Sequence, residues 1–165
     1  MKSNKKGARG FTLIEILVVI GIIAILAAIV IIAINPARQF AQARNSQRTS
    51  NVNAILNAIG QNIADNKGLF TCPSYTLTTT ATDISKGGAN IRPCLVPTYM
   101  PELTVDPKVG ANSCVDGTPG DCATGTYDSG YFVSQDANGR VTISAPTALT
   151  ETAISATPPS ISVTR

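Results

Sequence analysis

The chain has 165 residues, enough for one domain of ordinary size. It contains no histidine, so histidine-based acid/base chemistry, histidine-ligated metals and histidine-activated nucleophiles are excluded, and an enzyme is not expected. The net charge of +3 comes from the N-terminal leader, because removing the four basic residues before Gly10 leaves nine basic side chains against ten acidic ones. The overall charge therefore does not indicate nucleic acid binding.

A run of nineteen apolar or glycine residues, Ile16 to Ile34, follows the basic leader. As an α-helix it is about 28 Å long, at about 1.5 Å per residue, which matches a hydrocarbon core of about 30 Å. A secretory signal peptide is the alternative, but its apolar region is about 7–15 residues long and ends in a small-residue cleavage site with a polar exit. Here the small residues Ala27-Ala28 lie within continuing apolar sequence. The run is therefore predicted to cross a bilayer, with the basic leader in the cytoplasm.

Glu15 places a carboxylate at the start of this span, where burial in lipid is costly. The side chain can extend to the interface, or it can meet a cationic partner within the membrane. A cut after Gly10 would create such a partner, the free α-amine of Phe11. The start of a helix favours a negative charge but not a positive one, so the amine of one subunit could be neutralised by Glu15 of its neighbour.

The segment Gly10-Phe11-Thr12-Leu13-Ile14-Glu15, with the apolar run behind it, resembles the class III leader and N-terminal helix of type IV pilins and type II secretion pseudopilins. The resemblance is specific over residues 5 to about 35. It implies that prepilin peptidase cuts between Gly10 and Phe11 and methylates the new amine of Phe11. It also implies that Glu15 recruits and registers copies of the chain into a helical homo-oligomeric filament. Membrane lipid before assembly and an inner-membrane assembly platform are the other implied partners.

Asn35-Pro36 follows the span. The proline either kinks one continuous helix, or Asn35 caps a second helix with Pro36 at its first position. The family often has a proline at the place of Ile32, so a break in the helix is expected about one turn later here.

Helical spacing of apolar residues continues after the break and is expected to end at Lys67-Gly68. Because this stripe begins only at residue 52, the helix is expected to be exposed over 37–51 and buried afterwards. The exposed part carries arginines and no acid, which fits either a solvated charged face or contact with acidic heads of neighbouring subunits. The stripe consists of Val52, Ile55, Leu56, Ile59 and Ile63, and the arginines are Arg38, Arg44 and Arg48.

Four cysteines lie beyond this helix: Cys72, Cys94, Cys114 and Cys122. They form no CxxC motif and the chain has no histidine, so a zinc site is not expected. Their even number in a small domain predicts disulfides, and therefore an oxidising compartment. Of the three pairings that four cysteines allow, we favour Cys72–Cys94 and Cys114–Cys122, because each closes a local loop.

Aspartates crowd the chain around the last two cysteines, at a spacing that does not fit an EF-hand. Some major pseudopilins hold calcium in a loop at a similar place, so the resemblance implies a Ca²⁺ site with Asp116, Asp121 and Asp128 as oxygen donors. Aspartates that simply form turns explain the same residues. Both interpretations stay open, and no other cofactor is expected.

The last third of the chain predicts short strands. Residues 131–133 and 140–143 flank Asn138-Gly139, a pair that tolerates positive φ, and predict a hairpin. Residues 161–164 alternate and predict a terminal strand, whereas residues 76–85 fit either an edge strand or an exposed loop. We therefore expect an α+β chain, in which a long hydrophobic N-terminal helix packs on a small antiparallel sheet of three or four strands.

These expectations divide the chain into a cleaved leader, residues 1–10, a transmembrane and filament-core helix, 11–34, its amphipathic continuation, 35–67, and a head outside the cytoplasm, 68–165. The expected function is a structural subunit that polymerises into an extracellular type IV pilus-like filament. A pseudopilin of a type II secretion system is the alternative within the family. From another class, a single-pass membrane-anchored binding domain that never polymerises is the rival.

Overall fold

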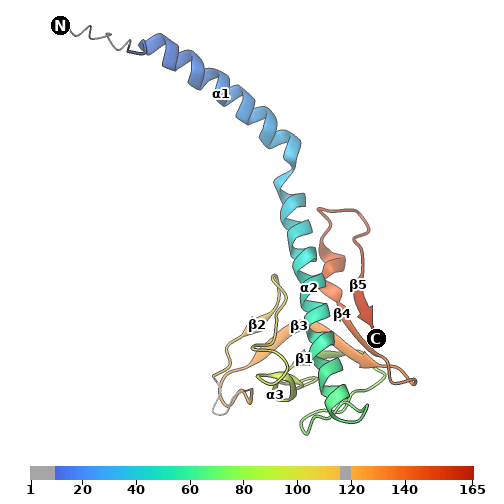
Figure 1. Cartoon of the computed structure of the whole chain (residues 1–165). Helices are drawn as coiled ribbons and strands as arrows, with labels where there is room; N and C mark the ends of the chain where they lie inside the picture. The colour runs from blue at the N-terminus through green and yellow to red at the C-terminus, as the bar shows by residue number, and fades with distance from the viewer. Residues whose placement is uncertain (1–9, 116–119) are drawn as a thin grey trace, which may run out of the picture. The chain divides into compact units, whose positions relative to one another are not determined.

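The structure is a computed structural model that describes residues 10–115 and 120–165 (Figure 1). Internal contacts divide the chain between Gln39 and Phe40 into an N-terminal unit and a head. The leader residues 1–9 and Asp116, one of the three predicted calcium ligands, lie outside the described residues.

The N-terminal unit contains helix α1, Leu13–Ile34, which is apolar on all sides and has no buried residue. It is long and apolar enough to cross a membrane. α1 ends at Asn35, whose φ of 46° lies in the left-handed region. The side-chain Oδ1 of Asn35 accepts the backbone N–H of Arg38, and Pro36 is the first residue of the next helix, α2. The chain therefore forms two helices with a capped start at Asn35, the second of the two alternatives.

Helix α2, Pro36–Asp65, buries the predicted stripe: Val52, Ile55 and Ile59 are completely inaccessible to solvent. The expectation of an exposed 37–51 stretch holds for residues 37–40 but is wrong beyond them, because one face of the helix is buried from Ala41 onward. The same face continues toward the N-terminus through polar residues that are also buried, Asn45, Arg48 and Asn51. α2 ends where predicted: Gly68 adopts a φ of 91°, and its N–H donates to the carbonyl of Ile63.

An antiparallel sheet of five strands follows, one or two more than expected. The strand order is β1-β3-β4-β5, and β2 also pairs with β3. β1 settles the open choice for residues 76–85 in favour of a strand, over its last four residues, and β2 is only two residues long, too short to leave an alternating pattern. The strands are β1 Thr82–Ser85, β2 Ala111–Asn112, β3 Tyr127–Gln135, β4 Val141–Ala145 and β5 Ile161–Thr164.

The β3–β4 hairpin and β5 lie where the sequence predicts them. In the hairpin turn Gly139 has a φ of 84°, and the carboxylate of Asp136 accepts the backbone N–H groups of Asn138 and Arg140. This bonding fixes the register of the two strands.

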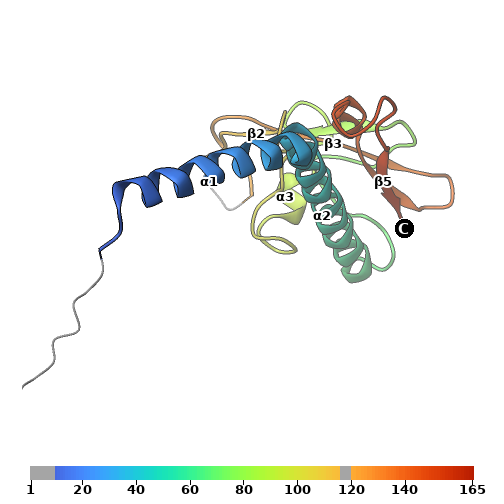
Figure 2. The same cartoon turned by 90° about the horizontal axis from the view of Figure 1, so that it is seen from above.

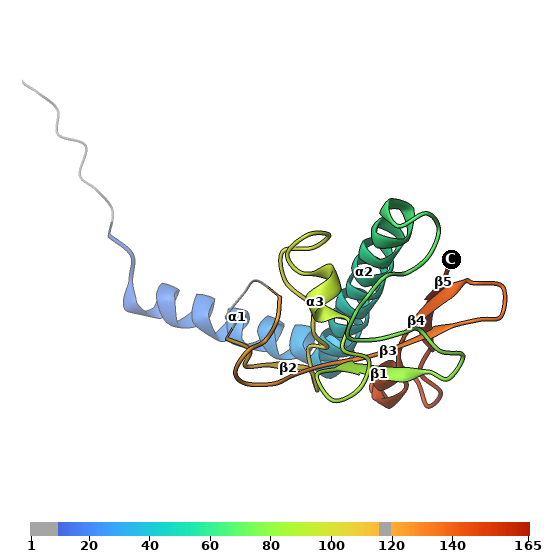
Figure 3. The same ribbon diagram turned by 90° about the horizontal axis from the view of Figure 1, so that it is seen from below.

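Helix α2 and the short helix α3, Arg92–Leu95, cover one face of the sheet, as seen from two directions in Figures 2 and 3. The core between the layers includes Ile55 of α2, Leu95 of α3, Tyr131 of β3 and Ile143 of β4. The 3₁₀ helix η1, Pro146–Thr150, and the loop that joins it to β5 lie beside the N-terminal half of α2 (Figure 1). α2 is thus an integral part of the head over most of its length.

Candidate functional site

The predicted processing segment has a defined local geometry. Gly10 and Phe11 are exposed in an extended stretch, and Thr12 is the N-cap of α1. The Thr12 hydroxyl accepts the N–H of Glu15 at 3.2 Å, and the Thr12 N–H lies 3.5 Å from the Glu15 carboxylate. This reciprocal capping box satisfies two N–H groups that a helix start leaves unpaired. Within one uncut chain, Glu15 therefore stabilises the start of α1.

The head contains a buried ionic cluster that the sequence did not predict. Arg48 donates from Nε and Nη2 to the carboxylate of Asp106, at 2.6 and 3.2 Å, and from Nη1 to Glu151, at 2.8 Å. Arg44, one helical turn earlier, forms a bidentate pair with Glu151 at 2.8 and 2.6 Å. Arg48 is 0% exposed, Asp106 1% and Glu151 3%. The cluster, defined as these four side chains, joins α2 to the residue that follows η1 and to the loop before β2.

Asp106 is the most heavily bonded member. Besides Arg48, it accepts the hydroxyl of Thr147 at 2.6 Å and the backbone N–H groups of Lys108 and Val109. These donors outweigh the effect of burial and lower the pKa of Asp106 to about 2. The side chain of Arg44 is the main cause that lowers the pKa of Glu151, also to about 2. Both carboxylates are therefore charged at neutral pH.

This cluster corrects the hypothesis on the basic part of α2. Arg44 and Arg48 were expected on an exposed face, either solvated or in contact with acidic heads of other subunits. Instead they are neutralised by two carboxylates of the same head. A sequence signal was present, since Arg48 lies one turn before Val52 on the continuation of the buried stripe.

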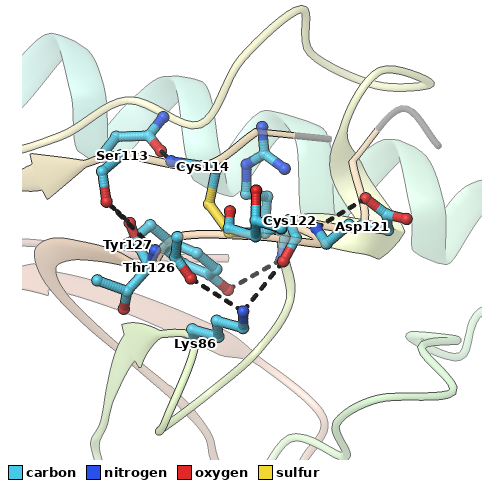
Figure 4. Close-up of a disulfide and its surroundings, with 12 residues drawn as sticks. Lys86, Ser113, Cys114, Asp121, Cys122, Thr126 and Tyr127 are labelled. Carbon is cyan, nitrogen blue, oxygen red and sulfur yellow. Dashed lines mark hydrogen bonds between the residues drawn. A yellow bond between two sulfur atoms is a disulfide. The ribbon is translucent and has the colours of Figure 1, made fainter. Parts of the chain in front are cut away.

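The structure pairs Cys72 with Cys94 and Cys114 with Cys122. These are the pairs that we favoured because each closes a local loop. Figure 4 shows the second disulfide with Lys86, whose ammonium donates to the backbone carbonyls of Cys122 and Gly125 at 3.0 and 2.9 Å. Lys86 follows β1 directly, so its ammonium group links the disulfide loop to the edge of the sheet. Both bridges are in the head, which is therefore expected to be in an oxidising compartment.

The two described aspartates of the predicted calcium site make local bonds. Asp121 accepts the N–H of Ala123, and Asp128 accepts the N–H of Gly130. Within residues 10–115 and 120–165, no group of three or more acidic or cysteine side chains has a metal-binding arrangement. Since Asp116 lies outside these ranges, the calcium site stays a prediction, while turn formation accounts for the bonds from Ala123 and Gly130.

The chain thus combines a capped N-terminal helix that is almost entirely apolar with an α+β head that contains two disulfides. Residues 5–33 match the family model of the prokaryotic N-terminal methylation motif. This motif is the class III prepilin leader of type IV pilins and pseudopilins, and the fold behind it is pilin-like. The motif implies processing by a prepilin peptidase and assembly into pilus-like multimers, and together with α1 it fits a membrane-anchored subunit. No curated protein and no solved structure matches the chain significantly.

Proposed function

We propose that the chain is a structural subunit that is cut after Gly10, methylated on Phe11 and polymerised through α1 into an extracellular type IV pilus-like filament. The observation that carries this proposal is the surface of α1. None of its 22 residues is buried in its own chain, and nearly all of them are apolar. Such a helix needs lipid around it before assembly and other apolar helices afterwards, because packing against similar helices removes it from both lipid and water.

Glu15 supports the same proposal. In the uncut chain its carboxylate bonds only the start of its own helix among the interactions described, through Thr12. The cut releases a cationic amine four residues away along the chain, at a helix end that disfavours a positive charge. A neighbouring subunit's Glu15 can then pair with this amine, which would set the axial register of the filament, while the inner-membrane platform extracts each subunit from the bilayer.

Mass spectrometry of the mature N-terminus tests the processing step. A chain that begins at methylated Phe11 is the expected result, whereas a chain that keeps its leader favours the rival, a membrane-anchored binding domain that never polymerises. Glu15→Gln tests assembly: it keeps the size of the side chain, so cleavage should proceed while filament yield drops. Cleaved Glu15→Gln subunits that assemble like the wild type would refute the role proposed for this carboxylate.

A pseudopilin of a type II secretion system remains the second candidate, because the same leader serves both classes. Electron microscopy of filaments sheared from cells separates the two. Long surface filaments labelled by an antibody against the head support the pilus. Loss of protein secretion on deletion, without surface filaments at native expression, supports the pseudopilus.

A further inference from the structure

One end of the head carries exposed apolar side chains around the ionic cluster. Phe40 is 66% exposed, Leu149 53% and Val109 49%. They belong to three segments that the cluster holds together: Phe40 lies one turn before Arg44 on α2, Leu149 lies two residues before Glu151, and Val109 follows Asp106 by three. Lys108 ties the second and third of these segments, since its ammonium donates to the hydroxyl of Thr150 at 3.2 Å. We call Phe40, Leu149, Val109 and Lys108 the basal patch.

The position of the patch along the chain limits what it can meet. Phe40 follows Ile34, the last residue of the apolar helix, by only six residues. Even a fully extended link of this length spans at most about 22 Å, and a helical one about 9 Å. Whatever the angle between the two units, the basal patch therefore begins close to the surface of any bilayer that α1 crosses.

The charge of the patch suits a phospholipid surface. The two carboxylates of the cluster, Asp106 and Glu151, are buried and neutralise the two arginines there. Lys108 is exposed and adds a positive charge at the surface. The loop that follows Glu151, residues 152–160, contains no charged residue at all. An apolar surface with a cationic rim is attracted to phosphate headgroups and can insert its side chains among the upper acyl carbons.

We propose that the basal patch rests on the phospholipid surface before the subunit is assembled, and so seats the head on the membrane. The proposal rests on the membrane anchoring of α1 in the proposed function. The basal patch would contact the lipid headgroup layer of the bilayer that α1 crosses. Seating would orient the head relative to the membrane without any contact to another subunit, and extraction into a filament would release the patch.

Single tryptophans provide the test, because the chain has none of its own. The full-length protein with Leu149→Trp is reconstituted at a low protein-to-lipid ratio into vesicles of phosphatidylcholine and phosphatidylglycerol that carry brominated acyl chains. Leu69→Trp is the matched control, since Leu69 is 72% exposed and follows the far end of α2. That end lies about 38 Å from Phe40 along the helix, at about 1.5 Å per residue. A third variant, Ile25→Trp in the middle of α1, reports on anchoring.

We expect the bromine quenching of Leu149→Trp to be several-fold stronger than that of Leu69→Trp, and to weaken when Lys108→Glu is added but not Lys108→Arg. Equal quenching at Leu149 and Leu69, with strong quenching at Ile25, overturns the proposal and leaves the anchoring intact. Weak quenching at Ile25 overturns both. A blue shift of Leu149→Trp that grows with protein density, without lipid quenching, would show that a second copy covers the patch, and it also overturns the proposal.

Discussion

Replacing Asp106 by asparagine tests whether the buried cluster holds the head together. The substitution keeps the size of the side chain but removes its charge and turns one acceptor oxygen into an NH₂ donor. Asp106 now accepts five hydrogen bonds, from Arg48, Thr147 and the backbone of the loop that follows it. One carboxylate oxygen accepts from Nε of Arg48 and the Thr147 hydroxyl, and the other accepts from Nη2 of Arg48 and two backbone N–H groups. Whichever oxygen the NH₂ group replaces, it faces buried donors, one of them from Arg48.

The structure sets the expected magnitude. Breaking a buried ion pair by removing one partner costs about 3–5 kcal/mol. Independently, the pKa of Asp106 falls from 3.8 to about 2, and at about 1.36 kcal/mol per unit this corresponds to about 2.5 kcal/mol of stability at neutral pH. We therefore expect Asp106→Asn to lower the free energy of unfolding by about 3 kcal/mol, which lowers Tm by about 10 °C for a domain of this size.

Thermal unfolding of the full-length protein in detergent, followed by the near-ultraviolet circular dichroism of its tyrosines, measures the effect. Asp136→Asn is the matched control, because the Oδ1 of asparagine can keep both backbone hydrogen bonds of the hairpin turn, so that only the surface ion pair with Arg140 is lost. Pairs of this kind contribute about 0–1 kcal/mol, so its Tm should change little. The reasoning is refuted if the two variants unfold within experimental error of each other.

Three further predictions concern pH, the disulfides and the glycines. Folding lowers the pKa of both Asp106 and Glu151, so the stability that these carboxylates provide is present above about pH 5 and is lost as the pH falls toward 2. The Tm of the wild type should drop across this window, and the Tm of Asp106→Asn should drop less steeply. Replacing both cysteines of Cys72–Cys94 by serine should lower the free energy of unfolding, measured in urea, by about 1 kcal/mol more than the same change in Cys114–Cys122. The reason is that the first disulfide closes a loop of 22 residues and the second a loop of 8. An equal loss in the two variants would contradict the loop-entropy argument. Gly60→Ala should stabilise the head by about 0.5–1 kcal/mol, because nothing lies within 4 Å of its new methyl group and alanine favours the helix. Gly130→Ala should destabilise it by more than 1 kcal/mol, since φ is +72° and the methyl group would lie 2.9 Å from Asp106 and Val109; urea midpoints that rank the two alanine variants the other way would contradict both.

The features that the sequence predicted correctly are those that depend on residues near one another in the sequence. The span, the β3–β4 hairpin and the terminal strand β5 each depend on residues close together in the sequence, whereas the sequence left open whether Asn35 caps a second helix. The disulfide pairs belong to the same kind, because each closes a short loop. The helix break also follows local rules, as Asn35 accepts from Arg38 and tolerates positive φ.

The ionic cluster was missed because its partners are distant in sequence. Arg48 lies 58 residues before Asp106 and 103 before Glu151, and no local pattern connects them. The apolar stripe begins at Val52, so apolar spacing alone does not show that the buried face extends toward the N-terminus. Arg48 and Asn45 occupy the same face, and Arg48 can be buried because its guanidinium donates to Asp106, Glu151 and the Oδ1 of Asn45. A helical face can therefore be buried beyond the end of its apolar stripe.

The neutralisation of Arg44 and Arg48 inside their own head bears on how a filament would respond to salt. Charges that pair across subunit boundaries in water are screened within about 10 Å at 0.1 M ionic strength, whereas buried pairs are screened much less. Because the two arginines are already paired in each subunit, their charges are largely neutralised before any neighbour arrives. In an assembled polymer, charge reversal elsewhere on the head should therefore change the salt dependence of cohesion more than the wild-type charges of these two arginines do.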